Sequence, residues 1–560
     1  MIRQDRDDGA IVLRARAELG PVVERVTDWL DHWAEATPEA VFLAERDGLG
    51  WREVSYGAAR DQARAMAAGL LDMGLGSERP LMVISGNSVA HGLLALACFY
   101  AGVPVVPVAE QYAALPAARG QLDQIAALIQ PAAVFAASPM PDVFEREALR
   151  GARPLTGQSL DALARVGGDL DAEVGPETVA KILMTSGSTT APKGVLTTHR
   201  MLCTNQAQIA ACLPFLRERP PVLVDWLPWN HVFGGSHNFN LVLANGGSLY
   251  IDGGKPVPAL VGKTIENNRL KQGTISFNVP VGFAALRDAM KADKGFARAF
   301  FEDLDMLFYA GASLPQDVWA DLEAMALDVR EDLPLFTSSW GLTETAPAAL
   351  LQHEPTDRSG VVGVPLPGVD VKLIPVEDRY EVRVKGPSIF KEYLGDPAKT
   401  AEAFDEKGFF RTGDAMAFVD PDNVNLGLKF DGRIGEDFKL MTGIWVRAAA
   451  LRLAVLDRLK GLAQDVVLVG EGHSEVGALI VPLPDCADAA EQAAERLGAL
   501  EGGSAARVAR VMVMAEPPSL ADGEITAKGN LNFARIKARR AALIERLYAD
   551  GEGVFLVGES

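Results

Sequence analysis

The chain has 560 residues, 48% of them hydrophobic, enough apolar material for two or more domains with large cores. Its 74 acidic residues outnumber its 54 lysines and arginines, and the net charge of −20 argues against nucleic acid or an anionic membrane surface as a main partner. Four well-separated cysteines form no metal-ligand pair or disulfide framework, and the charged N-terminus has no apolar signal segment, so we expect a cytoplasmic protein.

The first part of the chain predicts a parallel sheet with helical crossovers. Strand-like runs at Leu81–Ile84 and Val103–Val108 flank a helical pattern at Ser88–Tyr100, and this order implies a parallel pair with a right-handed crossover. The longest uncharged apolar run, Gly92–Ala109, is broken by prolines, which favours a buried helix and strand over a membrane span. Further expected elements here are helices at Val26–Thr37 and Ala58–Met73 and a strand at Ala132–Ala136.

The remaining pattern predicts an α/β fold with two domains. Strands and helices alternate at lengths typical of doubly wound layers; they are His199–Cys212, Val222–Leu227, Ser248–Ile251, Pro258–Asn267, Thr274–Val279 and Val281–Ala292. Runs at Asp370–Ile374 and Tyr380–Lys385 predict a small antiparallel β patch. We expect a large multi-layer N-terminal domain at 1–432, a linker within Asp431–Asp437, and a small mobile α+β domain at 433–560 that ends in a basic helix, Phe533–Tyr548.

The most informative stretch is a polar loop between two predicted strands. It reads Met184-Thr185-Ser186-Gly187-Ser188-Thr189-Thr190-Ala191-Pro192-Lys193-Gly194. Small residues let backbone N–H groups approach an anion, the hydroxyls add donors, and Lys193 adds a mobile cation, which together suit a polyphosphate. The order differs from a Walker A loop, in which the lysine follows the last glycine and a helix begins. An ordinary polar surface loop is the alternative.

The stretch resembles the phosphate-binding loop of the adenylate-forming superfamily, which contains acyl- and aryl-CoA synthetases, peptide-synthetase adenylation domains and luciferases. The resemblance implies that ATP phosphates contact Thr185, Ser186, Gly187, Ser188, Thr189 and Lys193, with Thr185 also catalytic. One departure is Thr190, where the superfamily usually has glycine, and a β-branched residue there predicts a stiffer loop.

A second stretch, Trp340-Gly341-Leu342-Thr343-Glu344-Thr345, combines an aromatic ring with a carboxylate, which suits a purine beside Mg²⁺. Alone, it would more often be a turn with a solvated glutamate. It resembles the superfamily's Tyr-Gly-x-Thr-Glu motif, which implies that Glu344 binds Mg²⁺, Thr343 contacts the α-phosphate, and Trp340 with Gly341 lies against adenine. Gly311 begins a stretch similar to the second adenine-side loop.

Motifs near the expected domain boundary are predicted to bind the ribose and to form the hinge. Asp414 ends a Thr-Gly-Asp match, and its carboxylate could accept both ribose hydroxyls; an Asx-type turn is the alternative. By resemblance, Arg433 contacts ribose or phosphate and Gly435 is the hinge, where the superfamily usually has aspartate or lysine. Lys439 and Gly443 would line the coenzyme A channel, although their spacing is one residue longer than usual.

Two further residues complete the expected catalytic set. His231 lies among aromatic residues and glycines, where the superfamily has an aromatic or histidine that guards the carboxylate; a satisfied core histidine is the alternative. Lys528 resembles the lysine that bridges carboxylate and α-phosphate during adenylation, but strict spacing puts Asn530 in that place. The sequence leaves open which of the two occupies it, and a solvated loop lysine remains an alternative.

Within the superfamily the chain looks most like feruloyl-CoA synthetases. The runs that carry this resemblance are Leu202–Gln206, Val224–Asn240, Gly246–Asp252 and Gly432–Lys439. Trp229, Phe233, Phe239 and Phe277 could line a flat slot for a planar cinnamate, or could equally belong to the core.

The resemblance implies a ligase that forms an aryl-CoA thioester through an acyl-adenylate, with ATP, Mg²⁺ and coenzyme A. Rivals are a ligase of the same fold for medium-chain fatty acids or benzoates, and a non-catalytic nucleotide-binding relative. An oxidoreductase has little support, since no Gly-x-Gly-x-x-Gly follows the first strand. The sequence leaves the oligomeric state open, with a homodimer as one option.

Overall fold

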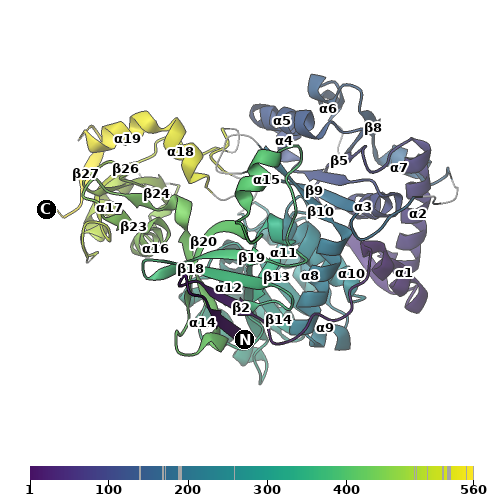
Figure 1. Cartoon of the computed structure of the whole chain (residues 1–560), viewed down its shortest axis with the longest axis horizontal. Helices are drawn as coiled ribbons and strands as arrows, with labels where there is room; N and C mark the ends of the chain where they lie inside the picture. Colours follow the sequence, from purple (N-terminus) through teal and green to yellow (C-terminus); the bar gives the residue numbers. More distant parts are fainter. Residues whose placement is uncertain are drawn as a thin grey trace.

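Two domains of unequal size form the protein, as the α/β prediction expected (Figure 1). This computed structural model describes residues 1–137, 140–166, 170, 172–186, 192–257, 259–484, 486, 488–500, 502–519, 522–525, 531–549 and 551–558. In Figure 1 the larger N-terminal domain lies to the right and the smaller C-terminal domain, in green and yellow, to the left.

A six-stranded sheet carries the phosphate-loop segment at one edge. Its strands, in spatial order, are β10 (Pro192–Thr198), β9 (Val179–Ser186), β6 (Val105–Val108), β5 (Leu81–Ile84), β7 (Ala133–Ala136) and β8 (Arg153–Leu155). All neighbours are parallel except β9 and β10, which form an antiparallel hairpin. The predicted parallel pair of β5 and β6 is therefore confirmed, and the loop does connect two strands.

A fifteen-stranded sheet supplies most of the remaining strands. In spatial order it contains β1 (Ile2–Asp5), β2 (Ile11–Arg14), β18 (Asp370–Val376), β19 (Arg379–Lys385), β20 (Phe410–Phe418), β21 (Leu428–Arg433), β17 (Val361–Pro365), β16 (Ala348–Leu351), β15 (Leu335–Gly341), β14 (Met306–Tyr309), β13 (Ile275–Asn278), β11 (Val222–Asp225), β12 (Ser248–Ile251), β3 (Val41–Asp47) and β4 (Gly50–Ser55). The run from β15 to β3 is parallel. The expected β patch, β18 with β19, is antiparallel and joins this sheet through β20 and β21.

Two buried helices separate the sheets. Helix α3 (Val89–Ala101) contacts β6 of one sheet and β3 of the other, and α8 (His199–Cys212) contacts β10 and β16. Only one residue of α3 is not buried, which explains why its sequence has no polar stripe. Among the helices that the structure describes, none combines the length and the apolar character needed to cross a membrane.

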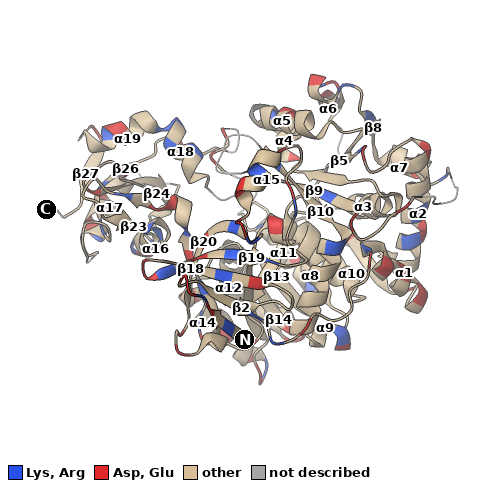
Figure 2. Ribbon diagram, viewed as in Figure 1, with Lys and Arg blue, Asp and Glu red and all other residues tan. Residues whose placement is uncertain are grey.

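The other N-terminal helices lie around the sheets and along the strand connections. They are α1 (Val26–Ala36), α2 (Tyr56–Asp72), α4 (Gln111–Ala114), α5 (Arg119–Ile129), α6 (Pro141–Phe144), α7 (Gly157–Leu163), α9 (Phe215–Glu218), α10 (Phe239–Ala244), α11 (Val261–Leu270), α12 (Pro280–Ala292), α13 (Lys294–Phe301), α14 (Gln316–Val329) and α15 (Pro397–Ala403). In Figure 2, basic and acidic residues are interspersed along the ribbon of both domains.

The C-terminal domain is a mixed sheet with helices on both faces. Its strands are β24 (Ala463–Val469), β25 (Val476–Pro482), β26 (Val508–Val513) and β27 (Val554–Leu556), and its helices are α16 (Ala448–Arg458), α17 (Ala489–Leu497), α18 (Phe533–Arg539) and α19 (Ala541–Tyr548). Alternate residues of β24 enter two separate hydrophobic clusters, Val466 with α16 and α17, and Val467 with α18 and α19.

Two expectations for this part of the chain were wrong in detail. The final basic helix is two helices, because Arg540 leaves the helical conformation and its guanidinium bonds the buried Glu524 carboxylate at 2.8 Å. The proposed linker begins inside β21, which continues to Arg433, so only the residues after it form the connecting turn η6 (Ile434–Glu436). The position of the domain boundary and the hinge at Gly435 stay predictions.

Candidate active site

The β9–β10 hairpin places the base of the phosphate loop beside a tyrosine. Thr185 of β9 pairs with Lys193 of β10, and Ser186 is the last residue of its strand. The Lys193 Nζ lies 5.1 Å from the centre of the Tyr393 ring, close enough for a cation–π interaction. The Leu394 N–H bonds the Gly194 carbonyl at 2.8 Å and fixes this approach. Gly187, Ser188 and Thr189 lie outside the described residues.

The same tyrosine connects the loop to the predicted metal-binding carboxylate. Glu344 lies in a short turn, η4 (Thr343–Thr345), and its Oε1 accepts a 2.9 Å hydrogen bond from the Tyr393 hydroxyl. The Glu344 carbonyl accepts from the Phe390 N–H at 2.8 Å, which ties the turn to the segment before Tyr393. Burial raises the pKa of Tyr393, so its hydroxyl keeps the proton that it donates. Lys193, Tyr393 and Glu344 therefore form one polar group.

Trp340 and Asp414 form a second group next to the first. The Trp340 indole N–H donates to Asp414 Oδ2 at 2.8 Å, and Arg433 Nε lies 3.2 Å from Oδ1 across the paired strands β20 and β21. Burial raises the pKa of Asp414 to about 6; Arg433 and Trp340 oppose this rise, and the charges of Glu436 and Glu344 add to it. The influence of Glu344 shows that the two carboxylates share one neighbourhood.

Asp414 keeps one oxygen available to a ligand. Its side chain is 2% exposed, and within the described part of the chain Oδ1 has no hydrogen-bond donor, because the contact with Arg433 is an ion pair without hydrogen-bond geometry. An orphaned carboxylate oxygen in a buried site costs free energy unless a ligand donates to it. This is the arrangement expected of a carboxylate that accepts from ribose hydroxyls.

Close backbone packing shapes the turn that holds Glu344. A Cβ on Gly341 would lie 1.7 Å from the Pro347 carbonyl oxygen, so only glycine fits where β15 passes this turn. Thr343 begins the turn, and Gly311 follows β14 at the same end of the parallel strands. Ligands of open α/β sheets bind at this carboxyl end. The roles of Thr343 at the α-phosphate and of Gly311 on the adenine side stay predictions.

His231 lies directly before a π-helical turn, η3 (Phe233–Asn238). It is half-buried, and its Nδ1 accepts from the Phe233 N–H at 3.2 Å. A Cβ on Gly235 would lie 2.1 Å from the Trp229 carbonyl oxygen, so this turn packs directly on the loop before it. π-helical turns often mark functional sites because they expose backbone groups that an α-helix would pair.

The expected aromatic slot is two separate clusters. Trp229 and Phe239 lie 5.0 Å apart and pack with Phe42 in the core between the sheets. Phe233 and Phe277, with centres 6.0 Å apart, instead pack around His237 and Phe308. The four predicted residues therefore do not line one slot; Phe233, in the turn that follows His231, packs against Phe277 of β13.

The structure does not bring the predicted coenzyme A residues to these groups. Lys439 and Gly443 lie on an exposed hairpin between β22 (Phe438–Lys439) and β23 (Trp445–Val446). The hairpin is held by the Met441 N–H, which bonds the His473 carbonyl at 2.8 Å within the C-terminal domain. Gly435, the predicted hinge, is exposed, and nothing lies within 4 Å of the place of a Cβ there.

Lys528 and Asn530 lie outside the described residues, but their flanks are placed. Ile525 and Leu531 form an antiparallel bridge, and Glu524 is fixed by Arg540. A Cβ on Gly523 would lie 3.5 Å from Gln121 Nε2 in α5, a helix that contacts β10. In Figure 1, α18 lies on the side of the C-terminal domain that faces α4, α5 and α15. Gly523, on the described flank before Lys528, thus lies close to α5.

The sequence analysis missed two residues that the structure places at the site. Tyr393 joins Lys193 to Glu344, but nothing local distinguishes it from an ordinary aromatic residue before a helix. Lys181 is buried in β9 and donates from Nζ to the Gly235 carbonyl of η3. Its signal was visible, since it is the one charged residue within the apolar run Val179–Met184.

A magnesium ion would find one suitable carboxylate in this arrangement. Among the residues that the structure describes, no three His, Cys, Asp or Glu side chains gather as a metal site. Mg²⁺ commonly binds one or two carboxylates together with substrate phosphates and water. Glu344, half-buried and oriented by Tyr393, fits that mode but not a resident metal site made by the protein alone.

Comparison with known proteins identifies the family. The family described as "AMP-binding enzyme" matches residues 30–394, which is well over half of the 560-residue chain. The chain belongs to the AMP-binding enzyme family. This membership agrees with the resemblance of its loop, adenine-side and ribose motifs to adenylate-forming enzymes.

Two curated members of the family illustrate its range. The chain is 29% identical over 325 residues to a long-chain-fatty-acid–CoA ligase of Salmonella typhimurium, covering 55% of this chain and 51% of that protein. It is 26% identical over 485 residues to a 3-[(3aS,4S,7aS)-7a-methyl-1,5-dioxo-octahydro-1H-inden-4-yl]propanoyl:CoA ligase of Rhodococcus jostii, covering 80% and 89%. The chain thus spans about half the length of the long-chain relatives that it matches.

Solved structures of the family share the fold. ATP-bound MatB from Rhodopseudomonas palustris superposes with a TM-score of 0.75 at 20% identity, covering 93% of this chain and 99% of that one. The O-succinylbenzoate coenzyme A synthetase MenE from Bacillus subtilis, in complex with AMP, gives 0.70 at 19% identity, covering 91% and 98%. At these identities the likeness establishes the fold of this AMP-binding enzyme, including its smaller C-terminal domain.

Proposed function

We propose that this protein is an AMP-forming acid–thiol ligase that joins an aromatic carboxylic acid of the hydroxycinnamate type to coenzyme A. The observation that carries the proposal is the meeting of Lys193, Tyr393 and Glu344 with the Trp340–Asp414 pair at one end of the sheets. This arrangement offers a cation for phosphates, a carboxylate for their metal and an acceptor for ribose. Membership of the AMP-binding family supports the same reading.

In the first step a carboxylate oxygen of the acid attacks the α-phosphorus of ATP. The bond from that phosphorus to the bridging oxygen breaks, and pyrophosphate leaves with the electron pair. Asp414 holds the ribose, Lys193 attracts the phosphates, and Thr185 and Thr343 direct hydroxyls toward the reacting phosphate. Such fixed donors stabilise the charge that develops in the transition state. Lys528 supplies the remaining cation from the C-terminal domain.

In the second step the coenzyme A sulfur attacks the acyl carbon. The bond between that carbon and the adenylate oxygen breaks, AMP leaves with the electron pair, and the thiol proton passes to solvent. The C-terminal domain turns about Gly435 between the steps, which withdraws Lys528 and brings the exposed hairpin of Lys439 and Gly443 to the site. His231 moves aside and opens the channel through which the thiol enters.

Glu344 would hold magnesium together with the phosphates of ATP. When bound, the metal neutralises phosphate charge and makes the α-phosphorus more electrophilic. Tyr393 orients the carboxylate through its 2.9 Å hydrogen bond, so that the ligand oxygen does not have to be ordered during binding. The net charge of −20 makes such local compensation necessary, because the overall field of the protein repels an anionic nucleotide.

An aliphatic acid is the second candidate substrate. The long-chain-fatty-acid name of the Salmonella relative favours it. The cluster of Phe233, His237, Phe277 and Phe308 favours an aromatic acid, since flat rings pack well against other rings. The Rhodococcus relative, whose printed substrate is a ring system on a short propanoyl chain, covers more of this chain and widens the range of acids to test.

A pyrophosphate-release screen over hydroxycinnamates, benzoates and fatty acids, with and without coenzyme A, tests the proposal. We expect acid-dependent pyrophosphate release with hydroxycinnamates, and multiple turnovers only when coenzyme A is present. Preference for octanoate over every aromatic acid would establish the aliphatic alternative. Binding of ATP without acid-dependent pyrophosphate release would instead identify a non-catalytic relative.

Replacement of Lys528 by alanine separates the two steps. We expect Lys528→Ala to slow adenylate formation by about 100- to 1,000-fold, because a fixed cation at the reacting phosphate is lost. Thioester formation from supplied acyl-adenylate should continue at the normal rate. Lys294→Ala, at a 72% exposed side chain on α13, is the matched control. Equal loss of both steps would remove Lys528 from the mechanism and leave Asn530 as the candidate.

A further inference from the structure

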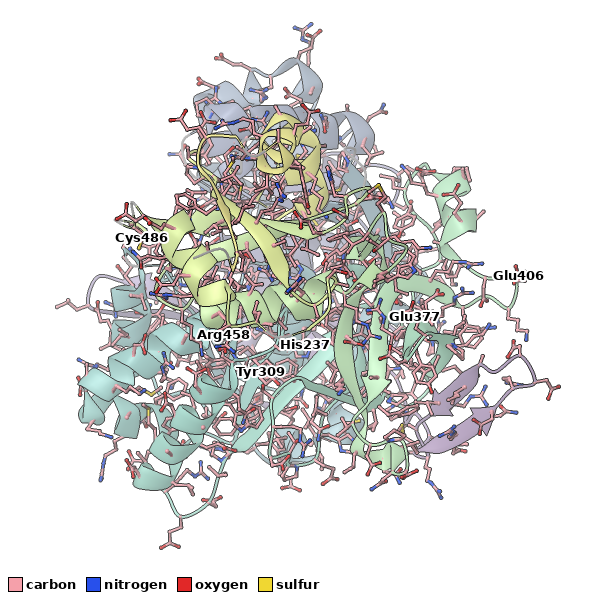
Figure 3. All side chains as sticks on the ribbon, turned by 90° about the vertical axis from the view of Figure 1, so that its left-hand side faces the viewer. His237, Tyr309, Glu377, Glu406, Arg458 and Cys486 are labelled. Carbon is pink, nitrogen blue, oxygen red and sulfur yellow. The ribbon has the colours of Figure 1, made fainter. Side chains whose placement is uncertain are left out.

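The π-helical turn that follows His231 contains a buried histidine with one unused ring nitrogen. His237 is 1% exposed, and its Nδ1 lies 2.9 Å from Asn238 Oδ1. Among the described residues, Nε2 has no hydrogen-bond partner. Figure 3 labels His237 together with Tyr309 of β14, the strand that also carries Phe308.

A chain of three side chains determines which nitrogen of His237 carries the proton. Asp225, at the end of β11, accepts from the Leu227 N–H at 3.1 Å and from Asn238 Nδ2 at 2.9 Å. The amide of Asn238 therefore directs Oδ1 toward His237, and a carbonyl oxygen can only accept. Nδ1 of His237 must then carry the proton, which leaves a lone pair on Nε2.

The ring is neutral, so this lone pair is available. Burial lowers the pKa of His237 to about 4, and the bond to Asn238 only partly opposes that effect. At neutral pH, Nε2 is accordingly a hydrogen-bond acceptor and carries no proton of its own. A buried acceptor without a donor is unfavourable, and its presence in a folded protein calls for a partner.

Aromatic carbon surrounds the acceptor. The centres of the Phe277 and Phe308 rings lie 5.2 and 5.1 Å from the His237 ring, and Phe233 lies at 5.7 Å. Phe277 and Phe308 are paired across the parallel strands β13 and β14, so they present neighbouring rings to His237. The surroundings suit the faces of a flat aromatic ligand, with Nε2 as a polar group that could orient it.

His231 and His237 lie on one short segment of the chain. His231 is the residue predicted to guard the reacting carboxylate, and His237 follows it by six residues within the π-helical turn η3. The aromatic cluster around His237 is therefore the candidate surroundings for the part of the acid remote from the carboxylate. A long alkyl chain would pass this point without any group that could donate to Nε2.

We propose that His237 determines specificity by accepting a hydrogen bond from a hydroxyl group on the aromatic ring of the acid, at the end remote from the carboxylate. The inference rests on the proposed function and narrows its substrate to aromatic acids that carry a hydrogen-bond donor there. Asn238 and Asp225 act as positioning residues, because they fix the proton on Nδ1 and keep Nε2 as an acceptor.

A bound hydroxyl also explains why Asp225, Asn238 and His237 form a polar hydrogen-bonded relay in this layer. Apolar side chains of the same shape could replace the whole relay with little loss of stability. A site that binds a substrate hydroxyl in this way rejects an analogue without the hydroxyl, because the acceptor then stays buried and unpaired. The relay is therefore better explained by a role in discriminating between acid substrates than by a contribution to the stability of the fold.

The test compares para-hydroxycinnamate with cinnamate. We expect the wild-type enzyme to prefer the hydroxylated acid by at least ~100-fold in kcat/KM, as for other sites that pair a substrate hydroxyl. His237→Phe should abolish that preference, mainly by slowing the hydroxylated acid. His237→Gln, which keeps an acceptor oxygen, should retain part of it. The ratio of two acids in one preparation does not depend on the fraction of folded enzyme.

His199 offers a matched control. It is also fully buried and neutral, with its pKa lowered to about 4 by burial, and it lies on α8 against Phe99 instead of the Phe277 cluster. His199→Phe should leave the preference between the two acids unchanged. An equal loss of preference in both variants would show a general packing effect and would overturn the assignment.

A measurement on the unmodified enzyme covers the case in which His237→Phe does not fold. With ¹⁵N-labelled histidine, para-hydroxycinnamate should shift one unprotonated ring-nitrogen resonance, assigned to His237 through the His237→Gln variant, and cinnamate should not. Efficient activation of aromatic acids with no hydroxyl preference, or with a preference that His237→Phe retains, would refute the inference and keep the ligase. Activation of fatty acids alone would refute the proposed function itself.

Discussion

The two sides of the candidate site, the proposed nucleotide side and the proposed acyl side, differ in chemical character. The nucleotide side, defined by Lys193, Glu344, Tyr393, Trp340 and Asp414, contains formal charges, and its Lys193 and Glu344 are half-buried. The acyl side, defined by Phe233, His237, Phe277, Phe308 and Lys181, is buried. Charged side chains are tolerated where phosphates or water can compensate the charge. Where no such compensation exists, the buried polar groups are neutral acceptors.

Lys181 is the exception on the acyl side. Burial lowers the pKa of its ammonium group to about 7, and its Nζ donates to the Gly235 carbonyl. The centre of the Phe99 ring lies 5.8 Å from Nζ. A lysine can tolerate this place because loss of its proton leaves a neutral amine, whereas a carboxylate on the nucleotide side must keep its charge to bind a metal.

Removal of the charge at Glu344 should give the largest effect. We expect Glu344→Gln to reduce the rate of pyrophosphate release by about 1,000-fold, because the amide cannot replace a carboxylate beside phosphate and metal. A pyrophosphate assay at saturating ATP measures it. Glu354→Gln, at a 78% exposed side chain, is the matched control. Turnover of Glu344→Gln near that of the control would place the phosphate chemistry elsewhere.

A smaller effect is expected at Asp414, with opposite signs for binding and stability. Asp414→Asn should raise the KM for ATP about 100-fold, because charged hydrogen bonds to the ribose are lost. In the wild type the same loss should appear as the pH falls below about 6, where Asp414 takes up a proton. Titration of ATP binding between pH 5 and 8 checks both expectations, and a flat profile would contradict them.

The stability of Asp414→Asn provides the second half of that test. Because the folded-state pKa is raised above the ordinary 3.8, the native state binds more protons in the window up to about 6, and stability falls as the pH rises through it. The asparagine variant should therefore unfold at higher denaturant than the wild type at pH 7, by on the order of 2 kcal/mol. A less stable variant would mean that Asp414 supports the fold.

The smallest predicted change tests the acyl side through stability alone. The folded-state pKa of Lys181 is lowered to about 7 from 10.5, so the unfolded state binds more protons above pH 7 and stability rises with pH. Between pH 7 and 8.5 the rise attributable to Lys181 is at most about 2 kcal/mol, the value at the maximal slope of one proton.

Denaturant unfolding of Lys181→Met measures this contribution. The variant keeps most of the side-chain volume and should lose the pH-dependent rise, whereas Lys294→Met, at an exposed site, should keep it. If both variants follow the wild-type profile, the Lys181 ammonium group is compensated in the folded state, and the contrast between the two sides of the site disappears.

Sequence patterns predicted local elements well where neighbours in the chain decide them. The strands β5 and β12 and the helix α8 have the predicted bounds, and the phosphate-loop segment does lie between two strands. The prediction of one continuous final helix was wrong because the break at Arg540 depends on Glu524. This residue is distant in sequence but is buried against Arg540. A helical pattern does not reveal a partner of this kind.

The prediction of one aromatic slot was wrong for a related reason. Trp229, Phe233 and Phe239 are close in sequence, but the π-helical turn directs Phe233 toward β13 and β14 and Phe239 toward the layer between the sheets. A single extra residue in a helical turn changes the face on which later side chains lie. The prediction rested on residue type, which does not say on which face of a turn a ring lies, and the core, its stated alternative, is where Trp229 and Phe239 are found.

The sequence by itself determined the chemistry available to this protein: a loop of small residues with one lysine, a carboxylate after an aromatic strand, and a Thr-Gly-Asp turn. Only the tertiary structure decided that Tyr393 joins Lys193 to Glu344, that Trp340 bonds Asp414, and that Asp225 and Asn238 leave His237 with a free acceptor. The reason is physical. Residue types carry donors, acceptors and charges, but burial and the partners supplied by distant strands decide which of them remain available to a substrate.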